Sequence, residues 1–108
     1  MIATYEDYYC KENVTLRIKS YREHSNLAIE MFCADSDWEE PFAMLTTNLP
    51  NYDLPNDLAF VDTNNLRTGF DFILKYKLGE LIGFGQSGFC TYPLIKFNLD
   101  EVKKYAQA

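Results

Sequence analysis

The sequence predicts an α+β domain: a single antiparallel sheet of four to six strands with one main helix and a short C-terminal helix. Three observations lead to this prediction. Apolar and polar residues alternate along several short segments, most of these segments are joined by connections too short for parallel crossovers, and one longer segment has apolar residues at helical spacing. The chain has 108 residues, of which 47% are hydrophobic. One hydrophobic core is all that this length supports, so we expect a single domain over residues 1–108.

The strands are expected where apolar residues alternate with polar ones, or where β-forming residues follow a turn. In the first of them Val14, Leu16 and Ile18 alternate with polar residues, which is the period of a half-buried strand. The short connection at 23–26 is typical of a hairpin. The expected strands cover residues 13–21, 27–33, 41–49, 58–62 and 89–99.

The main helix is expected over residues 66–78. Its apolar residues recur at i, i+3, i+4 and i+8, which places them on one helical face; they are Phe70, Ile73, Leu74 and Leu78. The turn at 63–65 supplies asparagines that suit a helix start, and Gly79 stands where a helix ends in the left-handed conformation. Gly69 opposes the helix, because glycine costs about 1 kcal/mol relative to alanine there.

Loops and a second helix complete the expected fold. The segment 50–57 contains two Pro, two Asn and two Asp, so it is expected to be a loop. The glycine-rich segment 83–88 is expected to be a flexible turn in which Gly88 has a positive φ. Asn98 followed by Glu101 resembles a capping box, which predicts a short helix over 99–106.

The overall charge argues against two classes of partner. The chain has 10 basic and 16 acidic residues, a net charge of −6. Because nucleic acids and anionic membranes both attract basic proteins, we expect no direct binding to nucleic acid and none to a membrane. The first residues carry acids and tyrosines instead of the basic and apolar regions of a signal peptide, so we expect a cytoplasmic protein.

No pattern in the sequence signals catalysis. The run 83–88 matches GxGxxG, but Pro93 closes a strand-like run where a nucleotide-binding fold needs a helix. Cys90 and His24 lie far apart in the chain, and the three cysteines lack the paired spacing of zinc sites, so all three are expected to be thiols. We therefore expect no enzyme activity, no catalytic residue, no cofactor and no metal site.

The feature that points to a function is the distribution of charge. Between Arg22 and Arg67 the sequence has nine acidic residues and no Lys or Arg, which predicts one acidic face. Four of the acids surround Trp38, a residue type that often anchors interfaces, and acids steer association with basic partners. The alternative is a solvated turn whose Trp38 folds back onto the sheet edge. The expected partner-binding residues are Asp35, Asp37, Trp38, Glu39, Glu40, Asp53 and Asp57.

Exposed tyrosines are a second expected contact region. The chain has eight tyrosines. Tyr5, Tyr8 and Tyr9 near the first residue, and Tyr52 in the 50–57 loop, are expected to be exposed and able to contact a partner. Packing in the core or at an edge strand is the alternative for each of them.

Four runs of residues resemble an uncharacterised bacterial family, domain of unknown function 4313. The runs are EPFAMLTTNLP at 40–50, AFVDTNN at 59–65, LGE at 78–80 and SGFCTYPL at 87–94. The resemblance spans about residues 8 to 100. It implies a small acidic protein encoded on phages and conjugative elements, mainly of Gram-positive and gut bacteria, and it supplies no catalytic residues.

The resemblance and the acidic segment together lead to an expected function. Small acidic proteins of mobile elements often inhibit host defence nucleases, whose nucleic-acid channels are basic; this step is an analogy. We expect a non-enzymatic inhibitor of the anti-CRISPR or anti-restriction type, which binds the basic surface of a defence nuclease in the host bacterial cytoplasm. The alternative is an accessory regulatory or interaction protein of the element with no nuclease target. The identity of the partner and the oligomeric state stay open.

Overall fold

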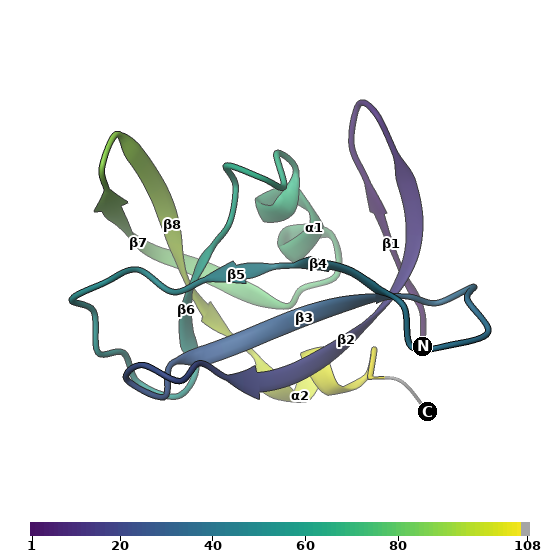
Figure 1. The fold of residues 1–108 in the computed structure, drawn as a ribbon, viewed down its shortest axis with the longest axis horizontal. Coiled ribbons are helices and arrows are strands. Elements are labelled where there is room, and N and C mark those ends of the chain that lie inside the picture. Colours follow the sequence, from purple (N-terminus) through teal and green to yellow (C-terminus); the bar gives the residue numbers. More distant parts are fainter. Residues whose placement is uncertain (107–108) are drawn as a thin grey trace.

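Residues 1–106 fold into two four-stranded antiparallel sheets with two small helices (Figure 1). The computed structural model describes residues 1–106. The strand order is β1-β2-β3-β4 in the first sheet and β5-β6-β8-β7 in the second. The strands are β1 Ala3–Glu6, β2 Lys11–Ser20, β3 Leu27–Cys33, β4 Pro41–Met44, β5 Thr46–Thr47, β6 Leu58–Val61, β7 Gly79–Ser87 and β8 Cys90–Phe97. The helices are α1 Gly69–Lys75 and α2 Leu99–Lys103.

The predicted α+β fold, with a single sheet and one main helix, is therefore wrong. Strands are present in the five regions where they were expected, but they divide between two sheets. The expected main helix is reduced to the seven residues of α1, while β1 and β7 add strand segments that were not expected. Two hairpins, β1–β2 and β7–β8, project from the same side of the molecule with α1 between them (Figure 1).

Leu45 is the point at which the chain passes from one sheet to the other. It is fully buried and separates β4 from β5, which were expected to form one strand over 41–49. Its N–H donates to the carbonyl of Ile29 in β3 (2.9 Å), and its carbonyl accepts from the N–H of Asp62 after β6 (3.0 Å). One stretch of β-forming residues thus serves both sheets, because a strand that turns a corner can belong to two sheets.

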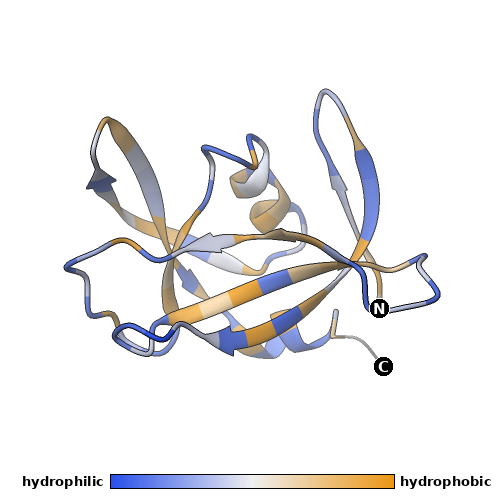
Figure 2. Cartoon of the chain, in the orientation of Figure 1, coloured by the Kyte–Doolittle hydropathy of each residue, from blue (hydrophilic) through white to orange (hydrophobic). Residues whose placement is uncertain are grey.

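The hydrophobic core lies between the two sheets. Strand β3 is its centre: every residue of β3 except Glu30 is buried, and Figure 2 shows the strand as a hydrophobic strip with one hydrophilic interruption. The strands expected at 13–21 and 27–33 are present as β2 and β3. The expected alternation of burial is wrong for β3, whose two faces are both buried, and in β2 Thr15 is buried between Val14 and Leu16. The two strands pair along seven residues, which confirms the predicted hairpin.

Strand β1 was absent from the sequence-based prediction. It pairs with the beginning of β2, and its Ala3 and Tyr5 are fully buried. The ring of Tyr5 packs against Phe42 and Phe72 at centroid distances of 5.7 and 5.9 Å, so the expectation that Tyr5 is exposed is wrong.

Helix α1 begins later and ends earlier than expected. Gly69 is its first residue and packs closely, because an added Cβ would lie 3.2 Å from Val61 Cγ1. Ile73 of the expected face is fully buried, whereas Leu74 is half exposed and Phe72 takes its place in the core. A glycine at the helix start is less costly than one in the interior, which removes the conflict that Gly69 posed.

The end of α1 is a Schellman motif. The Leu78 N–H donates to the Ile73 carbonyl (2.9 Å), and the Lys77 N–H donates to the Leu74 carbonyl (3.2 Å). Lys77 has the positive φ of 57°, so the expectation that Gly79 occupies this position is wrong. Gly79 begins β7 instead.

The segment 83–88, expected to be a flexible turn, is mostly strand. It belongs to β7, which pairs with β8 up to Ser87 and Cys90. The turn itself is Gly88 followed by Phe89. Gly88 has a φ of 60° and is the only turn residue with a positive φ, as in a type II′ hairpin, which confirms the expectation for Gly88.

Helix α2 is capped as expected but is shorter than expected. The Asn98 side chain accepts a hydrogen bond from the Glu101 N–H (3.3 Å). The helix ends at Lys103 instead of reaching 106, and the chain returns to β2, where the Leu16 N–H donates to the Tyr105 carbonyl (2.9 Å). Among residues 1–106, no helix has the length and apolar character needed to cross a membrane.

Candidate functional site

The acidic segment forms the connection between β3 and β4, here called the Trp38 loop (residues 34–40). Hydrogen bonds hold both of its ends. The Ala34 N–H donates to the Asn13 carbonyl (2.8 Å), and the Cys33 N–H donates to the Glu40 carbonyl (2.9 Å). The Asn13 side chain also donates to the Asp35 carboxylate (3.1 Å). The loop is thus fixed to the sheet at its base, with its middle projecting into solvent.

Trp38 lies in the exposed middle of the loop. The backbone around it is closed by a hydrogen bond from the Glu40 N–H to the Trp38 carbonyl (2.8 Å), and the Trp38 N–H points to Ser36 Oγ at 3.5 Å. The residue keeps 63% of its surface exposed, so it does not fold back onto the sheet edge. Most of the indole is available to another molecule.

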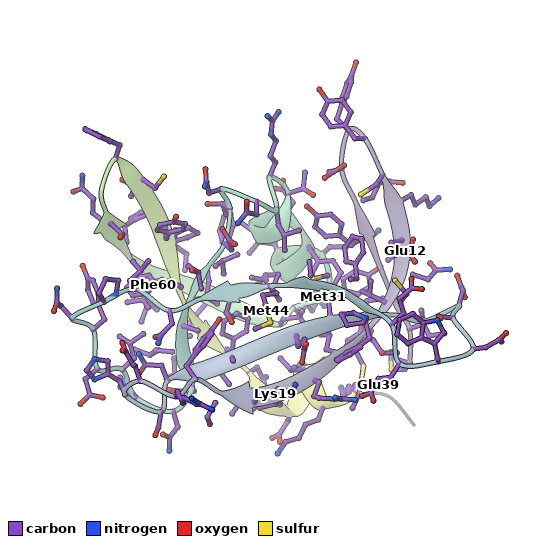
Figure 3. All side chains as sticks on the ribbon, in the orientation of Figure 1. Glu12, Lys19, Met31, Glu39, Met44 and Phe60 are labelled. Carbon is purple, nitrogen blue, oxygen red and sulfur yellow. The ribbon has the colours of Figure 1, made fainter. Side chains whose placement is uncertain are left out.

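The four carboxylates of the loop differ in their surroundings. Asp37 is exposed, and Asp35 is exposed with only the Asn13 amide as a partner. Glu39, which is labelled in Figure 3, forms an ion pair with Arg17. The Arg17 guanidinium also lies 4.3 Å from the centre of the Phe32 ring. The acidity of the loop is therefore partly offset by β2.

Glu40, the fourth carboxylate, is half-buried. It lies beside the buried thiol of Cys33, and burial, with hydrogen bonds to Glu40 and Glu12, raises the pKa of Cys33 to about 12. The thiol is therefore neutral at physiological pH. This part of the loop serves the packing of β3 and β4 more than the surface.

A groove of about 550 Å³ borders the Trp38 loop. Its lining combines apolar side chains with three charged residues. It is lined by Leu16, Arg17, Ile18, Phe32, Glu39, Val102, Lys103 and Ala106. The loop and the groove share Glu39, so a partner that covers the loop could extend into the groove.

Asp53 and Asp57 are not brought to the Trp38 loop. They lie in the β5–β6 connection, at the opposite end of the long axis of the molecule, which extends over 38 Å (Figure 1). Buried Asn26 fixes this connection: its amide nitrogen donates to the Tyr52 carbonyl (2.8 Å), and its oxygen accepts from the Leu54 N–H (2.9 Å). The expected seven residues therefore form two separate acidic groups instead of one face.

The tyrosines expected to be exposed also separate. Tyr8 and Tyr9 lie in the turn of the β1–β2 hairpin and are strongly exposed, which confirms the expectation for these two residues. Tyr52 is half-buried, and its ring packs edge-on against Phe60 at a centroid distance of 4.8 Å.

Sequence reasoning missed the apolar surface of the β7–β8 hairpin. Leu81, Ile82, Phe84 and Phe89 are all exposed there. A signal was available, because the sequence from 81 to 95 contains no charged residue. This surface was missed because residues 83–88 were expected to form a flexible turn, whereas they belong mostly to an edge strand that exposes its apolar side chains.

The residues considered for chemistry are dispersed. His24 is exposed in the β2–β3 turn of the first sheet, and Cys90 begins β8 in the second, so the structure does not join them as nucleophile and base. The three cysteines are free thiols, as expected. Within the described part of the chain, no group of three or more His, Cys, Asp or Glu could hold a metal ion.

Comparisons with known proteins identify a family and nothing further. A search of curated proteins and a search of solved structures each gave no match. The family model described as "Domain of unknown function (DUF4313)" matches residues 15–108, a span that includes all four runs that suggested the resemblance. The chain therefore belongs to the DUF4313 family.

Proposed function

We propose that this protein is a non-enzymatic inhibitor of a host defence nuclease, of the anti-CRISPR or anti-restriction type. In this proposal the Trp38 loop docks on the basic nucleic-acid-binding surface of the nuclease in the bacterial cytoplasm. The observation that carries the proposal is an exposed Trp38 beside exposed carboxylates, on a loop whose ends are hydrogen-bonded to the sheet. A loop held in this way loses little conformational entropy on binding.

The loop offers two separable contributions to binding. Asp35 and Asp37 would raise the association rate with a basic partner, and this effect weakens with salt because exposed charges are screened over about 8 to 10 Å. Trp38 would slow dissociation, since a tryptophan buried at an interface can contribute about 2 kcal/mol or more. Asp53 and Asp57, at the other end of the molecule, lie outside this proposed interface.

The proposal is tested by nuclease cleavage assays with and without the protein. Asp37→Lys and Trp38→Ala change the two exposed groups, whereas Glu39 and Glu40 are left alone because of their contacts with Arg17 and Cys33. We expect Asp37→Lys to reduce the association rate and Trp38→Ala to speed dissociation. Inhibition should fall about tenfold or more for Trp38→Ala, with an unchanged melting temperature.

A matched control is Asp53→Lys, which makes the same charge change at an exposed position on the other end. It should inhibit like the wild type. The proposed docking surface is wrong if Asp37→Lys and Trp38→Ala inhibit fully at physiological salt. If the wild type inhibits no defence nuclease but binds a protein of a conjugative element or phage, the accessory regulatory function applies instead.

A further inference from the structure

The outer edge of β7 is an open sheet edge with very little charge. Strand β7 is the last strand of the second sheet, and Glu80 is its only charged residue. Sheet edges in soluble proteins are usually protected by charges, by proline, by a bulge or by a covering element. Here a bulge between Leu81 and Gly83 interrupts the ladder, and from Gly83 to Ser87 the strand is regular and uncharged.

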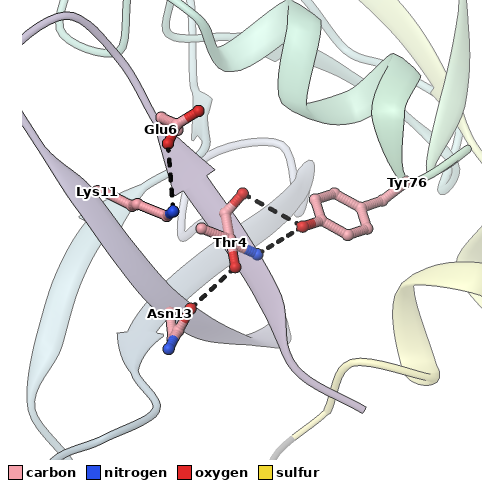
Figure 4. A network of polar contacts seen from close by, with 5 residues as sticks. All are labelled: Thr4, Glu6, Lys11, Asn13 and Tyr76. Atoms are coloured by element: carbon pink, nitrogen blue, oxygen red, sulfur yellow. Dashed lines mark hydrogen bonds and ion pairs between the residues drawn. The ribbon is translucent and has the colours of Figure 1, made fainter.

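The outer edge of β1, in contrast, is covered by Thr68 and Tyr76, the two residues that flank α1. The Tyr76 hydroxyl accepts from the Thr4 N–H (2.7 Å) and lies 3.4 Å from the Thr4 carbonyl (Figure 4). The Thr68 hydroxyl donates to the Glu6 carbonyl (2.7 Å). Within residues 1–106, the backbone of β7 has no such bonds beyond its pairing with β8. The fold thus protects one hairpin edge and leaves the other open.

The open edge coincides with the largest exposed apolar residues of the second sheet. Leu81, Ile82, Phe84 and Phe89 are 41, 48, 65 and 106% exposed. With about 200 Å² for a whole large side chain, their exposed surface amounts to roughly 500 Å². A patch of this size is at the upper end of what monomeric proteins expose, and such patches often mark a binding surface.

We propose that a second copy of this chain occupies the edge, with the two β7 strands paired antiparallel across a two-fold axis. Gly85 is the midpoint of the regular stretch, so the axis passes near it and Phe84 faces Gln86 of the second copy. Glu80 then lies outside the paired stretch. Each chain carries a charge of −6, and two copies therefore repel each other least where neither has a charge.

The buried area sets the expected strength of this dimer. Two patches of roughly 500 Å² bury about 1,000 Å², the lower limit for a specific interface. The dimer should therefore be weak, with a Kd in the micromolar range. This surface is independent of the Trp38 loop, so the dimer can form whether or not the loop binds a nuclease.

Sedimentation equilibrium from about 1 µM to about 500 µM tests the proposal with the intact protein. The wild type should shift from monomer to dimer across this range. Phe84→Lys should weaken the dimer at least tenfold, because it removes apolar contact and adds like charges beside the axis. Tyr8→Lys is the matched control: it adds the same charge to the exposed tip of the other hairpin and should leave the dimer unchanged.

The antiparallel register has its own test. In this arrangement the two Gln86 side chains lie on the same face, close to the axis, so Gln86→Lys and Gln86→Glu should each weaken the dimer several-fold. An equimolar mixture of the two variants should form heterodimers at least as stable as the wild type. The proposal is wrong if the wild type stays monomeric over the whole concentration range, or if Phe84→Lys dimerises as strongly as the wild type. The antiparallel register is wrong if the mixture of Gln86→Lys and Gln86→Glu forms no heterodimer more stable than the dimer of either variant alone.

Discussion

Replacing Gly85 by alanine tests how the second sheet is packed. A Cβ at Gly85 would overlap Phe60 Cε1 and lie 2.5 Å from Phe60 Cζ. The ring cannot move aside cheaply, because it is almost fully buried and Tyr52 packs edge-on against it. The extra methyl group must therefore displace either the ring or the strand.

The expected cost follows from what overpacking does in other cores. Forcing a methyl group into a filled site costs about 1 to 3 kcal/mol. For a chain of this size that corresponds to a fall in melting temperature of about 4 to 12 °C. Gly83→Ala is the matched control in the same strand: its added Cβ meets nothing closer than Leu94 at 3.9 Å, so its stability should stay near that of the wild type.

Thermal and urea unfolding followed by far-UV circular dichroism, at one low protein concentration, measure both variants. Trp38 fluorescence is less suitable, because Trp38 is exposed in the folded protein. A double-mutant cycle with Phe60→Leu adds a second test, since a smaller side chain at position 60 should reduce the penalty of Gly85→Ala. Equal stability of Gly85→Ala and Gly83→Ala, or a strictly additive cycle, would refute this account of the packing.

Three further predictions concern the core and the edge of β1. Ile73→Asp should lower the free energy of unfolding by more than about 4 kcal/mol and leave the chain largely unfolded by circular dichroism, because it buries an unpaired carboxylate; a native melting curve would contradict this. Tyr76→Phe should cost about 0.5 to 1.5 kcal/mol in urea unfolding, since the Thr4 N–H loses its acceptor, and no measurable change would show that water replaces the hydroxyl. The raised pKa of Cys33, about 12, means that the folded state holds its proton where the unfolded thiol, near pH 9, has lost it. Stability should therefore decline above about pH 9, less steeply in Cys33→Ala, and mass-spectrometric labelling at pH 8 should modify exposed Cys10 long before Cys33.

The features that could be predicted from the sequence are those set by neighbouring residues. The alternation of Val14 and Leu16 with polar residues predicted β2, because side chains of a strand alternate between faces. Asn98 predicted the start of α2, since its side chain needs only an N–H three residues away. The positive φ of Gly88 could be predicted because glycine adopts it without steric cost. The Trp38 loop was likewise located between two strands.

Other features depend on contacts between residues far apart in the chain. Nothing local distinguishes Leu45 from its neighbours, and only its bonds to Ile29 and Asp62 make it the corner between two sheets. The edge of β1 is completed by Tyr76, 72 residues from Thr4. The tertiary structure also decided that Asp53 lies at the opposite end from the Trp38 loop, although both belong to one acidic stretch. Residue types and their spacing determine hydrogen bonding and side-chain direction over a few positions, but the pairing of strands depends on which distant apolar surfaces are buried together.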